Sequence, residues 1–337
     1  MRELADALPE SGETVTLGLA ARSFSLIYGW RLGISHEEAE VVFSEAERMA
    51  SKAGDIGSRA ILLSAYGIVR GLNEGDVREY ARLARQAFAL AEESGDPAIC
   101  VGAAPTAYGL FCTGEYREGV SIYDRAIELA DGDVTVGAGI LFACPYALCH
   151  ALKGIHLLEL EEARRLLEQG RKIAREQGDI EQVGWSHMWS SWLAYFQGEP
   201  EAALAHAQQA LEIAERIGGS FLRAMAWFHI GLAERMRGEW QRAIEALERS
   251  LAIARERRHA EHDAWRLALL GESYLGLGDL ERARALVAEG VEIAQTRGHR
   301  SGETHASLAL ARVLLGSAGP AARAEIEAAL ARALELT

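Results

Sequence analysis

The feature that most constrains this chain is a repeat with a period of about 40 residues. Five of the glycines that are followed by Asp or Glu are spaced by about 40 residues or by twice that distance, and the same register extends to three further positions. These anchors are Gly75, Gly114, Gly198, Gly238 and Gly278, extended by Ile34, Leu158 and Gly319. Fixed periods between about 20 and 50 residues are typical of stacked supersecondary units that bury their apolar faces against one another. The sequence therefore predicts eight similar units in a row.

Residue size is also periodic, at fixed distances from each anchor. Twelve residues after each anchor the residue is small in every unit: Ala46, Ala87, Ala126, Gly170, Ala210, Ser250, Gly290 and Ala331. Five residues after each anchor it is small in every unit except the second, where Tyr80 stands. Small residues let helix axes approach closely, and large aliphatic residues three positions further along fill the space between them. The pattern indicates pairs of tightly packed helices.

Each unit is interpreted as a helix A, the anchor turn and a helix B of about 20 residues. Ser35 with Glu38 forms a capping box, Asp279 can accept unpaired backbone N–H groups, and Pro200 occupies a first-turn position. Glycines such as Gly54 suit the left-handed residue that ends a helix. We therefore expect an all-α fold, a right-handed superhelical solenoid of about eight helix-turn-helix repeats.

Charge and lysine content exclude two classes of function. The chain has 35 Lys and Arg against 49 Asp and Glu, a net charge of −14, which opposes binding to nucleic acid. None of the three lysines, Lys52, Lys153 and Lys172, follows a glycine, so no phosphate-binding Gly-Lys loop is present. We expect no nucleic-acid partner and no nucleotide cofactor.

Cysteine spacing and the N-terminal residues favour a cytoplasmic protein. The four cysteines lack the C-x-x-C spacing of zinc or redox sites and are predicted to be reduced core residues: Cys100, Cys112, Cys144 and Cys149. The first residues include Arg2, Glu3 and Asp6 and form no secretory signal. Residues 134–152 carry no charge, but they fall where the repeat requires a buried helix, so we expect no membrane span.

The helix-turn-helix unit resembles the tetratricopeptide repeat. The match is clearest in Ala226-Trp227 through Gly231, followed by Gly238-Glu239-Trp240 and Ala243. It covers residues 20–337 and implies that residues 1–19 are the end of a preceding helix and a linker. The period near 40 differs from the usual length of about 34.

The longer unit and the stretches at residues 141–146, 278–284 and 324–330 resemble the C-terminal repeats of bacterial signalling proteins with class III cyclase and AAA-type ATPase domains. The chain is similar, more distantly, to the repeats of sugar-responsive transcription activators and peptide-sensing quorum receptors. The resemblance implies a sensing or partner-binding region of a larger bacterial signalling protein.

Catalytic and metal sites are not indicated by residue spacing. The run His259-Ala260-Glu261-His262-Asp263 falls at a turn between helices, where polar residues are expected. His150 and His156 are six residues apart and therefore lie on different faces of a helix. Adjacent carboxylates diverge on a helix and form no acid–base pair. We expect no metal site and no enzymatic activity.

The resemblance to the tetratricopeptide repeat implies which helix A residues line the concave face. The candidate ligand-binding residues are Trp185, Met188, Trp192, Tyr195, Phe228, Arg235, Trp265 and Glu272. Upstream, the same positions give Phe24, Tyr28, Arg31, Tyr108 and Phe111. This lining is apolar and aromatic, with isolated charges.

Three interpretations of the lining are open. A tight superhelix could bury these side chains as core, an open groove could bind a peptide or amphipathic helix, or the aromatics could stack on a small ligand such as a sugar. We expect at least partial exposure of Trp185 and Trp192, because burying both would require the superhelix to close almost completely.

These observations predict a non-enzymatic scaffold that binds a protein or peptide segment in its concave groove. The alternative is a small-molecule receptor domain of a transcription or ATPase regulator, with an oligosaccharide as one candidate ligand. Groove polarity separates the two, because a sugar site needs several convergent hydrogen-bonding groups. Whether the chain forms a homo-oligomer is left open.

Overall fold

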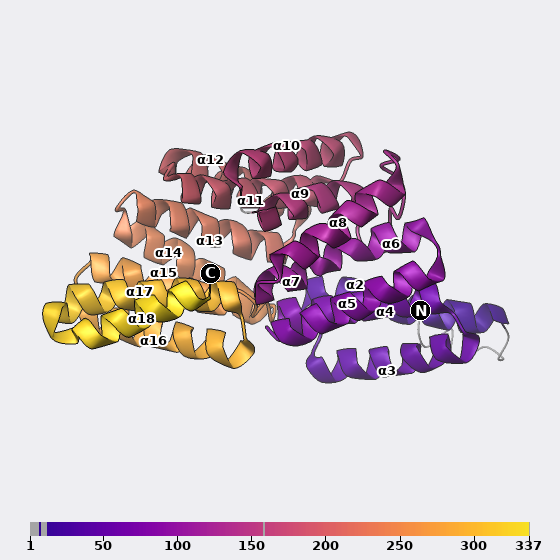
Figure 1. The fold of residues 1–337 in the computed structure, drawn as a ribbon, viewed down its shortest axis with the longest axis horizontal. Coiled ribbons are helices and arrows are strands. Elements are labelled where there is room, and N and C mark those ends of the chain that lie inside the picture. Colours follow the sequence, from indigo (N-terminus) through magenta and orange to yellow (C-terminus); the bar gives the residue numbers. More distant parts are fainter. Residues whose placement is uncertain (1–6, 8–11, 158, 337) are drawn as a thin grey trace.

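The chain is built from consecutive pairs of helices, as the repeat predicts (Figure 1). The computed structural model describes residue 7, residues 12–157 and residues 159–336. The pairs are α2 (Gly12–Leu32) with α3 (His36–Ala53); α4 (Ile56–Ile68) and the π-helix η1 (Val69–Asn73) with α5 (Val77–Ser94); α6 (Pro97–Ala103), η2 (Ala104–Ala107) and α7 (Tyr108–Thr113) with α8 (Tyr116–Ala130); α9 (Pro145–Leu157) with α10 (Leu160–Glu176); α11 (Ile180–Gln197) with α12 (Pro200–Ile217); α13 (Ser220–Met236) with α14 (Trp240–Glu256); α15 (Asp263–Gly276) with α16 (Leu280–Arg297); and α17 (Arg300–Ala318), followed by η3 (Gly319–Ala322), with α18 (Arg323–Glu335). Within the described residues this confirms an all-α solenoid of eight units.

The predicted helix caps are confirmed. The side chain of Ser35 accepts the N–H of Glu38 at 3.2 Å, and that of Asp279 accepts the N–H of Arg282 at 3.1 Å. Gly54 ends α3 in the left-handed conformation, at φ 67°. The caps can be predicted from the sequence because each cap involves residues only three or four positions apart.

The small residues twelve positions after the anchors are buried in the first seven units, as expected for helix contacts. The predicted register is wrong in the last unit, where Ala331 is exposed and Ala329 and Ala333 are buried instead. The cause is local. Gly319 begins a short 3₁₀ turn, so α18 starts at Arg323 and its buried face is displaced.

Tyr80, the large residue in a column of small ones, is accommodated by glycines on neighbouring helices. A methyl group on Gly71 would lie 2.1 Å from the tyrosine ring, and one on Gly109 would lie 2.9 Å from it. Gly71 belongs to η1, the π-helical segment at the end of helix A in this unit. In the second unit the large residue stands on helix B and the small residues stand on the helices that pack against it. The helices can therefore still approach closely.

The solenoid starts earlier than the sequence suggested. Helix α2 begins at Gly12, so residues 12–19 belong to the first unit and not to a linker. The end of a preceding helix, which the resemblance implies for the first part of residues 1–19, lies outside the described residues, apart from residue 7.

The uncharged stretch at residues 134–152 is only partly helical, which corrects the expectation of one buried helix. Residues 131–144 form turns, with Gly137 and Gly139 at φ 73° and 78°, and α9 begins at Pro145. Positive φ angles at two glycines and a proline at the first helical position explain this late start. No helix among the described residues is long and apolar enough to cross a membrane.

The superhelix closes on itself, so that the first three units contact the last three (Figure 1). The N–H of Ala260, between α14 and α15, donates to the carbonyl of Leu72 in η1 at 2.9 Å. Arg31 of α2 forms an ion pair with Glu181 of α11 at 3.0 Å. Closure brings the inner faces of the A helices together, and their buried side chains join the residues packed between helices A and B in one continuous hydrophobic core.

Candidate functional site

Four of the predicted inner-face aromatics meet near the middle of the closed superhelix. The ring of Trp265 lies 6.0 Å from that of Trp192 and 5.2 Å from that of Phe228, both at steep angles. Phe111 of α7 contacts Trp192 at 5.4 Å, and His305 of α17 stacks on Trp265 at 4.0 Å. Edge-to-face contacts of this kind stabilise aromatic cores. Five helices from different units therefore supply one cluster.

The expectation that Trp185 and Trp192 are partly exposed is wrong. Their exposed fractions are 7 % and 8 %, and Met188, Phe228 and Trp265 are buried as well. The physical reason is the contact between the first and last units, which covers the inner face. For these five residues the core interpretation holds in the closed state.

The first unit presents different residues to the interior from those predicted. Phe24 and Tyr28 are 40 % and 56 % exposed and stack on each other at 6.0 Å. Trp30 takes the inner position instead, 5.4 Å from Phe221 and 6.5 Å from Trp185. The sequence contained Trp30 in helix A, but only closure against α11 and α13 shows which face of α2 is buried.

The remaining predicted residues, Tyr195, Arg235 and Glu272, lie in a partly accessible group that also contains two residues outside the candidate ligand-binding set, Phe196 and Arg312. We call this group the polar edge. The carboxylate of Glu272 pairs with Arg235 at 3.2 Å and with Arg312 at 2.5 Å. Arg235 also lies 5.9 Å from the ring centre of Tyr195. Phe196 is 48 % exposed beside this group. Two guanidinium groups share one carboxylate, so one positive charge remains available.

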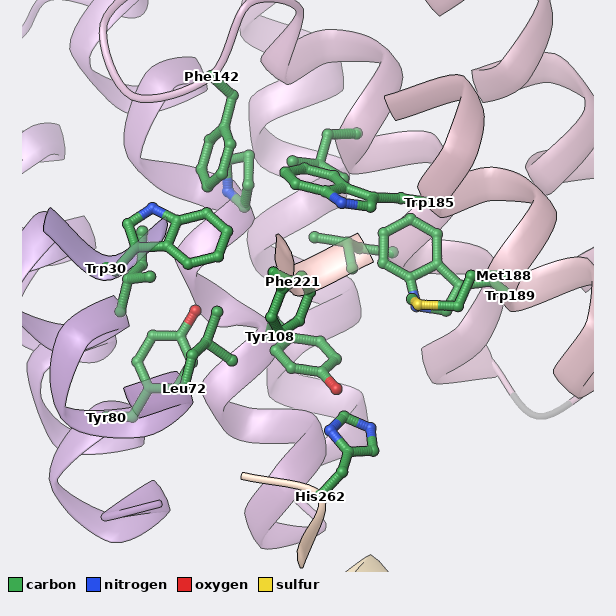
Figure 2. Close-up of a pocket in the computed structure, with 14 residues that line it drawn as sticks. Trp30, Leu72, Tyr80, Tyr108, Phe142, Trp185, Met188, Trp189, Phe221 and His262 are labelled. Atoms are coloured by element: carbon green, nitrogen blue, oxygen red, sulfur yellow. The ribbon is translucent and has the colours of Figure 1, made fainter. Parts of the chain in front are cut away.

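A small cavity lies between the first units and α11 (Figure 2). Its volume is about 60 Å³, and the lining includes Trp30, Tyr80, Phe142, Trp185 and Met188. The indole N–H of Trp185 has no hydrogen-bond partner among the described residues. An apolar cavity of about 150 Å³ is known to hold benzene. In its closed state the cavity is therefore too small for a sugar ring.

A buried carboxylate links three parts of the chain where the superhelix closes. Glu261 accepts hydrogen bonds from the hydroxyl of Tyr108 at 3.0 Å, the thiol of Cys112 at 3.4 Å and Nε2 of His299 at 3.4 Å. Its other oxygen contacts Nδ1 of His262. Burial opposes the charge, but the two histidines outweigh it and hold the pKa of Glu261 well below its usual range. The run at residues 259–263 is visible in the sequence, but its contacts with Tyr108, Cys112 and His299 are not.

Cys112, Glu261 and His299 also lie close enough to be considered as metal ligands, within 4.8 Å of one another. Two of the three candidate ligand atoms, Nε2 of His299 and Sγ of Cys112, carry a proton that opposes metal binding. Nδ1 of His299 accepts the N–H of Gly302 at 3.0 Å, which leaves the proton on Nε2, and burial raises the pKa of the Cys112 thiol. A metal ion would need both atoms deprotonated. The residues fit a hydrogen-bonded carboxylate better than a metal centre.

Comparison with known proteins places the chain among repeat proteins. A family model described as tetratricopeptide repeat matches residues 222–296. No curated protein matches the sequence significantly.

Several solved structures share the fold at low identity. A Rap protein complexed with competence and sporulation factor is 14 % identical, with a TM-score of 0.67 over 97 % of this chain and 87 % of that chain. The apo form of RapI is 17 % identical, with a TM-score of 0.56 over 82 % and 97 %. A signal transduction ATPase (STAND) with a tetratricopeptide-repeat sensor, from Pyrococcus horikoshii, is 16 % identical, with a TM-score of 0.50 over 96 % of this chain. The chain spans about half of that protein, 52 % of its length.

The sequence match in units six and seven and the same helix pairing along the described chain agree on the fold: it is a solenoid of helix pairs that is similar to the tetratricopeptide repeat.

Proposed function

We propose that the chain is a non-enzymatic regulatory module that binds a segment of a protein or peptide partner at the polar edge. The observation that carries this proposal is the excess guanidinium of Arg235 and Arg312 over Glu272, beside the exposed ring of Phe196. An aromatic anchor next to an available cation can take an apolar residue and a neighbouring carboxylate from a partner. The segment that fits is short, acidic and apolar.

The structural neighbours support a regulatory role. One of them, the Rap protein, was solved as a complex with a factor, and another carries its repeats as the sensor of a signal transduction ATPase. On this basis we propose that the chain acts as the repeat region of a larger bacterial signalling protein. Partner binding would then change the contact between the first and last units, because the A helices that form the polar edge also pack in the closed core.

The alternative function, a receptor for a small sugar-like molecule, has less support. The cavity beside Trp185 is small and lined almost wholly by apolar groups. A sugar requires several convergent hydrogen-bonding groups and a larger volume. The closed superhelix therefore favours a partner that binds at the polar edge over a small ligand enclosed in the core.

An arrayed peptide library tests the proposal. We expect binding peptides to share an acidic residue next to a large apolar one. Phe196→Ala and Arg312→Ala should each weaken the best peptide by about tenfold or more, as loss of an interface anchor does. Affinity should also fall as salt increases, because the contact with Arg312 is half exposed.

Arg249→Ala provides a matched control, since Arg249 stacks on Trp227 at 4.4 Å away from the polar edge. This variant should bind the selected peptide as the unchanged protein does. Equal affinity in all three variants would contradict the proposed site, as would a selected peptide set with no acidic residues.

A further inference from the structure

A second cleft, which we call the arginine cleft, lies where the end of α2 meets the first turns of α11 and α13. Its volume is about 490 Å³. Its lining includes Arg31, Glu181, Phe221, Arg223 and Arg257. The chain has an acidic excess of 14 charges, yet three arginines and one glutamate line this cleft. The charge of this lining is therefore opposite in sign to that of the whole chain.

Two of the three arginines have little to neutralise them. Arg31 is committed to Glu181 at 3.0 Å and to the carbonyl of Ile27. Arg223 makes no ion pair and no side-chain hydrogen bond with any described residue, although its Nε atom is buried. The one ion-pair partner of Arg257 among the described residues is the adjacent Glu256, whose carboxylate lies 3.5 Å from the buried Nε atom of Arg257. A buried guanidinium donor without a partner costs stability, so these groups are poised for an acceptor.

The charge and shape of the cleft select the type of acceptor. Once Arg31 is paired with Glu181, the lining has two positive charges left, on Arg223 and Arg257. A phosphate monoester carries a charge of about −1.5 to −2 near pH 7 and offers several acceptor oxygens to planar guanidinium groups. A single carboxylate would leave one of the two arginines unpaired. Charge balance therefore favours phosphate over carboxylate.

The surroundings of the two arginines indicate what the phosphate is attached to. Phe221 and Ile217 line the same cleft, and Ile217 is partly exposed there. The first turn of α13 adds backbone N–H groups that no side chain caps among the described residues, because the N-cap residue is Gly219. The volume is large enough for a phosphate together with an apolar group of modest size.

We infer that the arginine cleft binds a small phosphate monoester with an apolar substituent, held by Arg223 and Arg257. This site is separate from the polar edge, and its occupant contacts α13 and α14 next to the ion pair that joins α2 to α11. Arg31 and Leu32 of α2 line the same cleft, so a phosphate held there also lies against the contact between α2 and α13 and should stabilise the closed superhelix.

Isothermal titration calorimetry with phenyl phosphate, inorganic phosphate and benzoate tests the inference. Phenyl phosphate should bind most tightly, inorganic phosphate more weakly because it lacks the apolar group, and benzoate weakest. Arg223→Met and Arg257→Met should each weaken phenyl phosphate by about ten- to hundredfold, the effect of losing a charge-assisted hydrogen bond. Affinity should fall below about pH 6, where the monoester takes up its second proton.

Two further measurements separate binding from folding. Without ligand, Arg223→Met should melt at the same temperature as the unchanged protein or above it, because it removes an unpaired half-buried cation. It should also bind the peptide selected at the polar edge with unchanged affinity, so the two sites can fail independently. Arg249→Ala should bind phenyl phosphate normally. The inference is overturned if phenyl phosphate does not bind, if Arg223→Met binds it equally well, or if benzoate binds as tightly.

Discussion

Lowering the pH from 7 to 5 is expected to destabilise the protein strongly, because several histidines are buried without charge. Burial lowers the pKa of His150, His156 and His259 to about 4 and that of His229 to about 3. Below pH 6.5 the unfolded chain takes up protons at these positions and the folded chain does not. Stability is therefore complete above pH 6.5 and is lost as the pH falls toward the folded-state pKa values.

The size of this effect follows from the shifts. Each of the four histidines contributes roughly 1.8 kcal/mol between pH 7 and pH 5, or about 7 kcal/mol together. That is comparable with the whole stability of a typical domain, about 5 to 15 kcal/mol. Urea unfolding at the two pH values measures it, and His229→Gln should reduce the difference by roughly 1.8 kcal/mol. An unfolding free energy that does not change between pH 7 and pH 5 would show that these side chains are hydrated.

Replacing Trp192 with alanine should cost about 3 to 5 kcal/mol of unfolding free energy, the usual loss for a buried aromatic residue. The ring is 8 % exposed and packs against Phe111, Phe196 and Trp265. Chemical denaturation of the variant measures the loss. An open groove would instead leave the ring solvated, and its removal would cost little.

Trp227→Ala is the matched control for this prediction. Trp227 is only partly buried and carries Arg249 on its face at 4.4 Å. Its removal should cost clearly less than that of Trp192. If the two substitutions cost the same, the inner face is not the core of the protein.

Local features of the fold were predictable because each depends on residues that are near one another in sequence. Caps such as Ser35 with Glu38 span three positions. The small residues twelve positions after the anchors contact the other helix of the same pair or of the next pair. The register failed in the last unit, where a short 3₁₀ turn before α18 changes the spacing. It also failed before Pro145, where two glycines replace the first turns of a helix.

The closure could not be predicted in the same way. Contacts such as Ala260 with Leu72 depend on small rotations that accumulate over several units. The repeat register fixes which side of helix A faces inward, and Trp192, Phe228 and Trp265 of units five to seven do contact one another across the superhelix. The burial of these residues depends on the units that pack against them from the other side of the superhelix. The same is true of the first unit, where Trp30 and not Tyr28 faces inward, and the sequence of a single unit does not determine such contacts.

Hydrogen exchange at the amide of Ala260 tests the closure most directly. This amide lies between two helices of the C-terminal half, and its partner is the carbonyl of Leu72 in the second unit, 2.9 Å away. In a closed superhelix it should exchange at least about a hundredfold more slowly than an unprotected amide. The exposed amide of Gly132 serves as the reference, since it has no backbone partner among the described residues. Exchange at Ala260 as fast as at Gly132 would show that the first and last units do not meet, and would contradict the closed superhelix.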